Sequence, residues 1–384
     1  MANAILIPGK EKRVYGGHPW VFRSDIARVE GDFTPGDIVS VYSSKGKFLA
    51  KAFYNPQSQI SLRIMSLHDE PIDRAFIFRR VKEAVDYRRT FADLRSCRLI
   101  FAESDRLPAL IVDSFGDVLV LQCLALGMER FKQDVVDALV EEVHPQGIYE
   151  RSDVPVRRLE GLEQLTGVMY GTVPDRVEML ENGVHFWVDV KEGQKTGFFL
   201  DQKENRAAIA PFVKGKTVLD CFTHTGSFAL NAAKGGAEHV TAVDVSESAV
   251  EMARANAARN GLTDRMDFLA ADVFDLLPQL EAAHEKPYDF IILDPPAYGR
   301  GANGEKWILE ENICEMLACC AQLLEPQGAF LVLNLYSMGL SSTLARTAVR
   351  QAFGAPLEEQ YGELCFTDRA GKQLPLGTYY RFIR

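Results

Sequence analysis

Hydrophobic and polar residues alternate in short runs along the first 66 residues, a pattern typical of β-strands. Runs such as DIVSVYS and KFLAKAFY are separated by TPGD, SSKG and NPQS, which are turn-forming sequences. The N-terminal part is therefore predicted to be a small β-barrel.

The period of the hydrophobic pattern then changes. From Arg74 to Arg98, apolar residues recur at helical spacing among arginines, which predicts a basic amphipathic helix. Two β-like runs follow, joined across residues 114–117, and residues 129–143 again have a helical pattern. These elements predict an α+β middle domain.

From Lys203 onward, strand-like and helix-like segments alternate regularly. The apolar runs TVLDCF, HVTAVD, MDFLAAD, YDFIILDPP and AFLVLNLYS favour a parallel sheet covered on both faces. VHFWVDV and GFFL are predicted as strands that lead into it, and GELCFT and TYYRFIR as an antiparallel hairpin at its edge. The fold class is α/β overall, with an N-terminal β-barrel at 1–68, an α+β domain at 69–180 and a doubly wound domain at 181–384.

Composition is that of an ordinary globular protein. The chain has 384 residues, 47% of them hydrophobic, which suits two or three domains. It has no run of about 18 apolar residues and no signal-like apolar centre near its start, so we expect no membrane association and a cytoplasmic location. The seven cysteines include no CxxC pair and the seven histidines are isolated. We therefore expect no metal.

Charge is distributed unevenly along the chain. The net charge of -10 disfavours a protein that coats nucleic acid indiscriminately. Residues 1–98, however, carry 17 Lys and Arg against 11 Asp and Glu, a net charge of +6. An RNA would therefore be met by the N-terminal part. A basic helix is also an ordinary solvated surface, so an RNA contact of the segment from Arg74 to Arg98 is one of two interpretations.

Aspartates end the predicted parallel strands, at positions 220, 244, 272 and 294. Ligands of open α/β sheets bind beyond these carboxyl ends. The loop after the first strand holds a single glycine, so the GxGxxG fingerprint and the phosphate-binding P-loop are both absent. One aspartate alone could be a turn or cap residue. Four together favour a ligand with a ribose, an adenine and a cationic tail but no phosphate, which describes S-adenosylmethionine.

Several segments together resemble a known family. LDCFTHTGSFALNAAKGGA, VTAVDVSESAVEMARANAARNG and IILDPPAYGRG resemble class I methyltransferases. IYERSDVPVRRLEGLE, EGQKTGFFLDQKENR and GGHPWVFRSDI resemble segments of the bacterial ribosomal RNA large subunit methyltransferase I family. The resemblance implies a PUA-like domain, a linking domain and a Rossmann-like methyltransferase domain. It also implies S-adenosylmethionine as cofactor and ribosomal RNA as partner, and it leaves a homodimer possible.

The resemblance assigns the cofactor contacts residue by residue. The lead-in segment EGQKTGFFLDQKENR is expected near the methionine moiety of the cofactor. The loop after the first strand is expected around the carboxylate and the sulfonium. The ends of the later strands are expected at the ribose, the adenine and the methyl group. In chain order these contacts are Phe198, Gln202, Asp220, Thr223, Thr225, Gly226, Asp244, Asp272 and Asp294. Of Phe198 and Phe199, one is expected to be a core residue.

The target atom stays open. Family members that methylate cytosine carbon-5 use a cysteine thiolate in a segment resembling FSCSG, where this chain has NLYSMG and places Ser337. A serine alkoxide is far harder to form than a thiolate, so Ser337 is a candidate but no simple replacement. The alternative is direct transfer to a nitrogen, with Asp294 as hydrogen-bond acceptor and Tyr298 stacked on the base.

The sequence predicts an S-adenosylmethionine-dependent RNA methyltransferase acting on a base of large-subunit ribosomal RNA. Two alternatives are a cytosine-5 methyltransferase with an unrecognised thiol and a non-catalytic ribosome-binding protein that keeps the cofactor pocket. The RNA contacts are expected in the N-terminal domain, the basic helix and the loop after DPPAY. They are Arg13, Trp20, Arg23, Arg79, Arg80, Arg88, Arg89 and Arg300.

Overall fold

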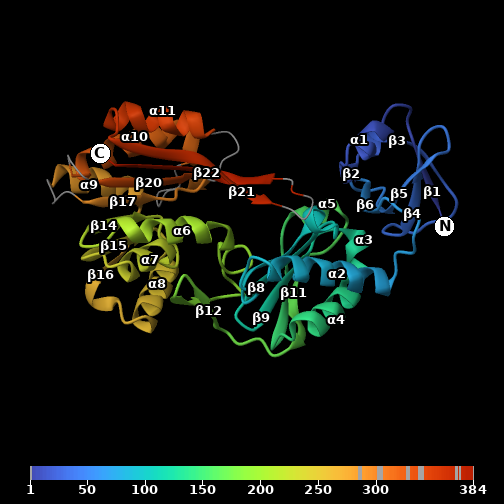
Figure 1. The fold of residues 1–384 in the computed structure, drawn as a ribbon, viewed down its shortest axis with the longest axis horizontal. Helices are drawn as coiled ribbons and strands as arrows, with labels where there is room; N and C mark the ends of the chain where they lie inside the picture. The colour runs from blue at the N-terminus through green and yellow to red at the C-terminus, as the bar shows by residue number, and fades with distance from the viewer. Residues whose placement is uncertain are drawn as a thin grey trace. The chain divides into compact units, whose positions relative to one another are not determined.

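The computed structural model describes residues 2–283, 288–300, 306–325, 329–335, 341–367, 371 and 373–383. The chain forms two compact units (Figure 1). The first comprises Met1–Met179 and Val188–Leu200, and the second comprises Leu180–Trp187 and Asp201–Arg384. Residues Val188–Leu200, which include most of the lead-in segment EGQKTGFFLDQKENR, thus belong to the first unit, although the sequence placed them with the C-terminal domain.

The first unit begins with a six-stranded sheet, in agreement with the predicted β-rich N-terminal domain. Its strand order is β2-β6-β5-β4-β1-β3, and β1 is parallel to β4. Alternate apolar residues such as Leu6, Val41 and Leu62 form its core. The elements are β1 (Asn3–Leu6), α1 (Glu11–Tyr15), β2 (Trp20–Val21), β3 (Ile26–Glu30), β4 (Ile38–Tyr42), β5 (Phe48–Tyr54) and β6 (Leu62–Ser66).

A five-stranded sheet with order β11-β10-β9-β8-β7 follows in the same unit. The basic segment forms α2 only as far as Arg89, and its end is strand β7, so the helix is shorter than predicted. Asp73 begins α2 by accepting a hydrogen bond from the backbone N–H of Phe76 (3.0 Å). The elements are α2 (Arg74–Arg89), β7 (Ser96–Phe101), β8 (Leu110–Phe115), β9 (Val118–Cys123), α3 (Leu126–Glu129), α4 (Lys132–Val143), β10 (Gly147–Ser152), α5 (Val156–Leu159) and β11 (Leu165–Gly171).

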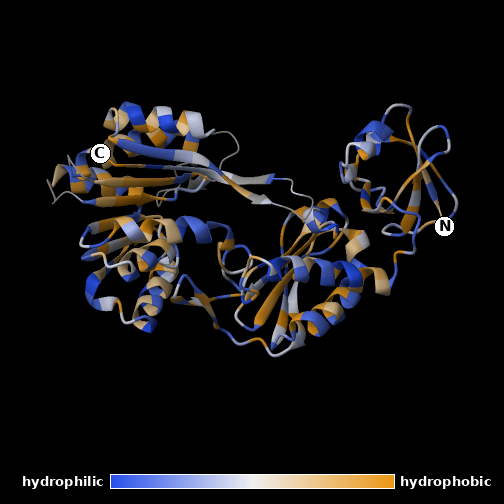
Figure 2. Ribbon diagram, viewed as in Figure 1, coloured by the Kyte–Doolittle hydropathy of each residue, from blue (hydrophilic) through white to orange (hydrophobic). Residues whose placement is uncertain are grey.

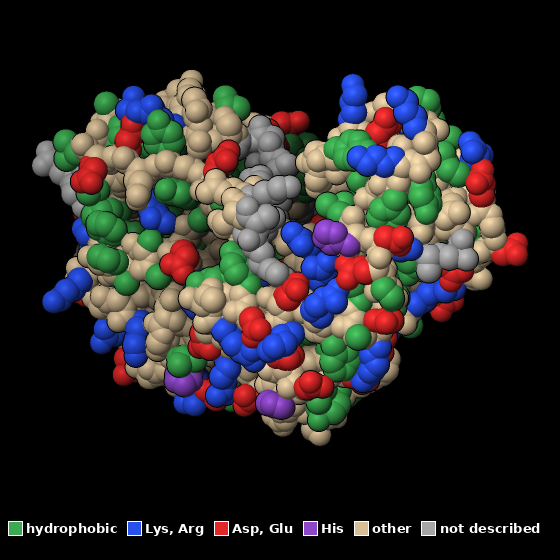
Figure 3. Space-filling model, turned by 45° about the vertical axis from the view of Figure 1, so that its right-hand side comes forward, with side chains coloured by type: hydrophobic (Ala, Val, Ile, Leu, Met, Phe, Trp, Pro, Cys, Tyr) green, Lys and Arg blue, Asp and Glu red, His purple; other side chains and the backbone are tan. Residues whose placement is uncertain are grey.

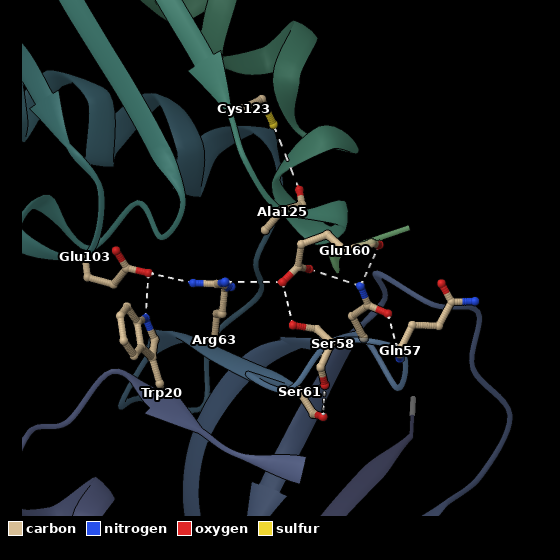
Figure 4. Close-up of polar contacts among 10 residues, drawn as sticks. Trp20, Gln57, Ser58, Ser61, Arg63, Glu103, Cys123, Ala125 and Glu160 are labelled. Carbon is tan, nitrogen blue, oxygen red and sulfur yellow. Dashed lines mark hydrogen bonds and ion pairs between the residues drawn. The ribbon is translucent and has the colours of Figure 1, made fainter. Parts of the chain in front are cut away.

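Buried polar contacts join these two sheets (Figure 4). Arg63 on β6 donates to Glu103 (3.1 Å) and to Glu160 (3.2 Å), both carboxylates of the middle region. The indole N–H of Trp20 also donates to Glu103 (2.7 Å), and the Ser58 hydroxyl donates to Glu160 (2.6 Å). Because Arg63 and Glu160 are both buried, the network fixes the N-terminal sheet to the middle region.

The second unit contains a seven-stranded sheet with order β16-β15-β14-β17-β20-β22-β21. Its first five strands in this order are parallel and β22 is antiparallel to β20, so the doubly wound sheet and its edge hairpin are confirmed. In Figure 2 the central strands are mostly hydrophobic, whereas the covering helices carry hydrophilic outer faces. Leu219, Ile291 and Leu333 point into the core shared with α9, α10 and α11.

The alternation of strands and helices predicted from residue 203 onward is present, whereas one strand predicted before it is not. GFFL is not a strand, because Gly197 has a φ of 128° and Leu200 begins a 3-10 turn at Leu200–Gln202. The elements are β12 (Val177–Glu181), β13 (Val184–Val188), α6 (Lys203–Ile209), β14 (Thr217–Cys221), α7 (Ser227–Lys234), β15 (His239–Asp244), α8 (Glu247–Arg259), β16 (Met266–Ala270), α9 (Val273–Ala282), β17 (Phe290–Leu293), β18 (Tyr298–Arg300), β19 (Lys306–Ile308), α10 (Leu309–Leu323), β20 (Phe330–Leu335), α11 (Ser342–Phe353), β21 (Glu358–Thr367) and β22 (Gln373–Ile383).

Candidate functional site

The order of the parallel strands reverses between β14 and β17, and this switch point is where open α/β sheets bind ligands. Asp220 lies on β14, and Asp294 directly follows β17. Cys221 pairs with Leu293, so both aspartates lie at the carboxyl edge of adjacent strands. We call the residues at this edge the strand-end site.

The loop from Phe222 to Gly226 adopts an unusual backbone conformation. Phe222, His224 and Gly226 have positive φ angles of 65°, 51° and 84°. A Cβ on Gly226 would lie 2.6 Å from Leu230 and 2.9 Å from Ala253, so only glycine fits there. Non-glycine residues with positive φ concentrate at functional sites, where the surrounding structure maintains the strain.

Asp220 is buried, and only one of its carboxyl oxygens is satisfied within the protein. Oδ2 accepts from the Thr223 hydroxyl (2.6 Å) and the Ala229 backbone N–H (2.9 Å). Oδ1 has no partner among the described residues. Burial raises the pKa of Asp220 to about 7, and the nearby Asp294 and Asp244 contribute in the same direction. These residues fit a ligand that brings a hydrogen-bond donor or a positive charge to Oδ1.

Asp244 holds the Phe222–Gly226 loop in place. Its Oδ2 accepts from the backbone N–H of His224 (2.8 Å), and its Oδ1 accepts from that of Ser246 (3.0 Å). Each carboxylate oxygen can accept a second hydrogen bond, so these contacts leave capacity for ribose hydroxyls. Asp244 therefore has a structural role in addition to the predicted one.

Asp272 is the N-cap of α9 and accepts from the backbone N–H of Phe274 (3.0 Å). The adjacent Ala271 N–H donates to the carbonyl of Asp244 (2.9 Å), which keeps the ends of β15 and β16 together. The cap interpretation of this aspartate is therefore correct, and its contact with adenine stays a prediction.

Asp294 is partly exposed, and the exclusion of water by the protein around its carboxyl group raises its pKa to about 7. The neighbouring Asp201 raises this pKa further, whereas Arg206 lowers it. Tyr298, four residues later, begins the ribbon of β18 and β19 and is 74% exposed. The side chain of Arg300 and the whole of Ser337 lie outside the described residues.

The lead-in segment divides between the two units. Gln202, in the second unit, is buried and accepts from Asn205 Nδ2 (2.8 Å). Phe198, in the first unit, is 4% exposed and is the buried member of the phenylalanine pair. Thr225, in the second unit, contributes its carbonyl to a hydrogen bond from Asn256 (3.0 Å). Gln202 and Thr225 thus lie in the unit of the strand-end site, whereas Phe198 is buried in the first unit.

The sequence did not predict how several polar residues of this unit pair with one another. Arg206 on α6 forms a bidentate ion pair with Glu181 on β12 (2.6 and 2.9 Å), which positions α6. Asn205 on α6, Asn334 on β20 and Arg381 on β22 are linked by hydrogen bonds. Single polar residues inside apolar runs were the only available signal, and nothing in the sequence pairs residues so far apart.

The described cysteines offer no activated thiol in the core. Burial raises the pKa values of Cys123, Cys221 and Cys320 well above the usual range. Cys319 is partly buried and its pKa is also raised, first by burial. The remaining cysteines, Cys97, Cys314 and Cys365, are partly or fully exposed. The buried thiols are therefore poor nucleophiles.

The arginines of α2 contact carboxylates or carbonyls of their own unit, and two of the four expected to bind RNA are buried. Arg88 is buried and binds Asp105 in a bidentate pair (2.5 and 2.7 Å), and Arg80 is buried beside Glu83. Arg79 donates to Glu70 (2.6 Å), and Arg89 donates to the Glu142 carbonyl (2.7 Å) and to an adjacent aspartate. Burial excludes Arg80 and Arg88 from a surface contact. Figure 3 shows blue and red side chains intermixed on the visible face.

Trp20 is likewise held within the first unit by its hydrogen bond to Glu103 and by the Arg63 guanidinium over its ring. Arg23, by contrast, is exposed and has no carboxylate partner in the described part of the chain. Arg13 contacts the buried Asp25 at 3.3 Å but is itself 44% exposed. Lys47 lies over the ring of Tyr15 on α1. We refer to the exposed side chains of Lys12, Arg13, Tyr15, Arg23 and Lys47 together as the α1 surface.

The described residues contain no group of three or more His, Cys, Asp or Glu side chains that could hold a metal ion. The described helices are also too short or too polar to span a membrane.

Comparison with family models identifies two regions. A PUA-like domain matches residues 4–67, and an S-adenosylmethionine-dependent methyltransferase domain matches residues 162–361. The chain is 38% identical to the ribosomal RNA large subunit methyltransferase I of Aeromonas salmonicida, over 98% of this chain and 95% of that protein. It is 42% identical to the Vibrio vulnificus protein of the same name, over 86% of this chain and 85% of that protein.

Solved structures share the fold. A Streptococcus mutans protein described as a candidate SAM-dependent methyltransferase superposes with a TM-score of 0.78, at 21% identity over the whole of both chains. A candidate methyltransferase complexed with SAH gives a TM-score of 0.80 at the same identity and coverage. The SAM-dependent methyltransferase from Agrobacterium tumefaciens gives 0.58 at 24% identity, over 72% of this chain and 87% of that one. The likeness at these identities concerns the fold.

Proposed function

Because the chain belongs to the ribosomal RNA large subunit methyltransferase I family and is an S-adenosylmethionine-dependent rRNA methyltransferase, we propose that Asp294 and Tyr298 hold the target base. The observation that carries this proposal is the placement of Asp294. It follows β17 at the switch point, and the exposed Tyr298 lies four residues later, after two prolines and Ala297. A carboxylate can accept from a base N–H, and a tyrosine ring can stack on the base plane.

The cofactor residues are proposed on the same unit. When bound, S-adenosylmethionine supplies a methyl group activated by a sulfonium. Asp220 would meet its positively charged part, because Oδ1 is buried and unpaired among the described residues. The loop around Gly226 allows close backbone approach, and Asp244 and Asp272 would accept from ribose and adenine. Gln202 completes this set, while Phe198 acts as a core residue.

For the target atom we propose direct transfer to a base nitrogen. Carbon-5 of cytosine needs a thiolate, and the buried cysteines Cys221 and Cys320 of this unit have raised pKa values. A nitrogen needs only to be oriented, which a hydrogen-bond acceptor and a stacking ring can do. Asp294 and Tyr298 supply these two groups, and Ser337 is not required.

Nucleoside mass spectrometry of ribosomal RNA from cells with and without this protein tests the proposed target atom. Loss of an N-methylated nucleoside in the deletion strain is the expected result. Loss of 5-methylcytidine would contradict direct transfer and support an unrecognised thiol, for which replacement of each exposed cysteine in turn is the next measurement.

For RNA binding we propose the α1 surface rather than α2. Arg13 and Arg23 keep their predicted roles and are joined by Lys12 and Lys47, all of them exposed. Tyr15 adds a ring that is 56% exposed for base stacking. Arg300, expected to contact RNA beside Tyr298, stays a proposal on sequence grounds.

Two assignments about the cell and the assembly are also proposals. A ribosomal RNA substrate favours a cytoplasmic location for this chain. A homodimer fits the unpaired outer edge of β21, which has no strand partner among the described residues. Sedimentation equilibrium of the full chain checks the dimer, and a monomer at micromolar concentration would contradict it.

A further inference from the structure

A network of hydrogen-bonded polar side chains, buried or partly buried, ends beside the strand-end site. Arg381 Nη2 donates to Asn205 Oδ1 (2.6 Å), and Asn205 Nδ2 donates to Asn334 Oδ1 (3.1 Å). Asn205 and Asn334 are each only 1% exposed. The network joins α6 to β20 and β22, which are labelled in Figure 1.

The arginine determines how both amides are turned. A guanidinium can only donate, so the Asn205 atom that it contacts must be the carbonyl oxygen. The amide nitrogen of Asn205 therefore donates to Gln202 Oε1 (2.8 Å) and to Asn334, which must present its own oxygen. The Nδ2 group of Asn334 is therefore not used by the network of Asn205 and Arg381. It has no hydrogen-bond partner among the described residues.

The register of the sheet places this free donor next to Asp294. Leu293 pairs with Leu333 in parallel strands. The residues that follow them are Asp294 and Asn334, so the Cα atoms of these two residues lie about 5 Å apart. Leu333 points into the core with α10, so by alternation Asn334 faces the side of the sheet that α6 covers. A hydrogen-bond acceptor and a hydrogen-bond donor thus lie side by side at the strand ends.

We propose that Asn334 binds the target base, with Nδ2 donating to an acceptor atom on the base edge while Asp294 accepts from a neighbouring N–H. An unstacked base offers such adjacent donors and acceptors on its Watson–Crick edge. A buried amide N–H left without a partner costs about 1–3 kcal/mol, which a bound base would offset. Asn205 and Arg381 act as positioning residues, because they set which atom Asn334 presents. This inference rests on the proposed base-binding role of the strand-end site.

The test replaces the donor while keeping the shape of the side chain. Asn334→Leu and the isosteric Asn334→Asp both remove the free N–H group. Methyl transfer from tritiated S-adenosylmethionine is measured on ribosomal RNA from cells that lack this protein, at saturating cofactor. We expect both variants to lower the rate about 10- to 100-fold, because the base acceptor is left unpaired. Cofactor Kd, measured by calorimetry, should stay within about twofold and shows that each variant is folded.

The positioning residues have a separate readout. Arg381→Met lets the amides turn over, so it should lower the rate, and Arg381→Lys should restore it because lysine also only donates. Ser114→Ala in the first unit is the matched control. It removes a buried hydroxyl that, like Asn334 Nδ2, has no partner in the described part of the chain. Its transfer rate should equal that of the original protein.

The outcomes separate this inference from the proposed function. If Asp294→Ala transfers methyl groups as fast as the unaltered protein, the proposed base-binding role of Asp294 fails. If the unaltered protein transfers and both Asn334 variants transfer equally well, the role of Asn334 is overturned. A cofactor Kd that weakens by the same factor as the rate also overturns it, because the amide would then bind the cofactor.

Discussion

At the scale of single residues, burial determines what the acidic side chains of the strand-end site can do. Asp220 and Asp294 both have pKa values raised to about 7, in each case first by removal from water. An aspartate at a strand end is common as a turn residue, but a turn residue in water keeps its ordinary pKa. The raised values therefore mark these two residues as candidates for binding or catalysis.

Asp294 should make methyl transfer depend on pH. With a pKa of about 7, its carboxylate is mostly protonated at pH 6 and mostly ionised at pH 8. If the ionised form accepts from the base, kcat/KM should rise about tenfold over this range. Asp294→Asn, which keeps an acceptor oxygen but cannot titrate, should remove the rise, and Asp294→Ala should abolish transfer while cofactor affinity stays within about tenfold. An unchanged pH profile in Asp294→Asn would contradict this role.

Asp220 should lower the stability of the cofactor-free protein at neutral and higher pH. Its folded pKa of about 7 lies above the unfolded value of 3.8, so the folded state holds the proton more tightly. Stability from this group is present at low pH and is lost as the pH rises from about 4 to about 7. Asp220→Asn should therefore raise the unfolding free energy by about 1–3 kcal/mol at pH 8, less at pH 5, and weaken cofactor binding. Thermal unfolding at both pH values checks the sign.

At the scale of elements, the contacts of α2 changed the surface that we propose for RNA binding. A helix with many arginines is indistinguishable in sequence from an RNA-binding helix. Tertiary contacts give the arginines of α2 carboxylate partners, including the buried Asp105. Charge density along the sequence did not show that these arginines have carboxylate partners or that Arg80 and Arg88 are buried.

Arg88 and Arg23 should respond oppositely to substitution. Arg88→Met leaves Asp105 buried and unpaired, so we expect a loss of about 3–5 kcal/mol of stability without a change in the salt dependence of RNA binding. Arg23→Met should leave stability within about 0.5 kcal/mol and weaken RNA binding, with a shallower salt dependence. Fluorescence anisotropy between 50 and 200 mM salt, roughly the range over which such binding falls, measures the RNA affinity of both variants and its salt dependence. Weaker binding in Arg79→Met but not in Arg23→Met would return the RNA surface to α2.

At the scale of the whole molecule, long-range contacts hold sequence-distant segments together within each unit. In the first unit, Arg63 bridges Glu103 and Glu160 across the junction of the two sheets. In the second unit, Glu181 holds Arg206 of α6, and Arg381 near the C-terminus fixes Asn205. Such bidentate or buried pairs specify one arrangement because breaking them leaves a charge without a partner.

The Arg63 bridge should be needed to hold the N-terminal sheet on the middle region. Arg63→Met leaves two carboxylates facing each other, so we expect faster proteolysis at residues 67–73 and weaker RNA binding. Cofactor affinity should not change, because its residues lie in the other unit. Arg28→Met, which removes an exposed pair with Glu30, is the control and should behave like the unaltered protein. Equal proteolysis of the two variants would show that the bridge is dispensable.

The sequence by itself determined the local elements, the parallel order of the second unit and the acidic strand ends. These follow from periodicity and from polar residues that end apolar runs, which are properties of neighbouring residues. Only the tertiary structure decided that Arg88 is core, that Phe198 belongs to the first unit and that Asn334 lies beside Asp294 with a donor that no described residue accepts. Each of these depends on which distant residues share a buried space, and burial sets both the pKa of an acid and the partners of an amide.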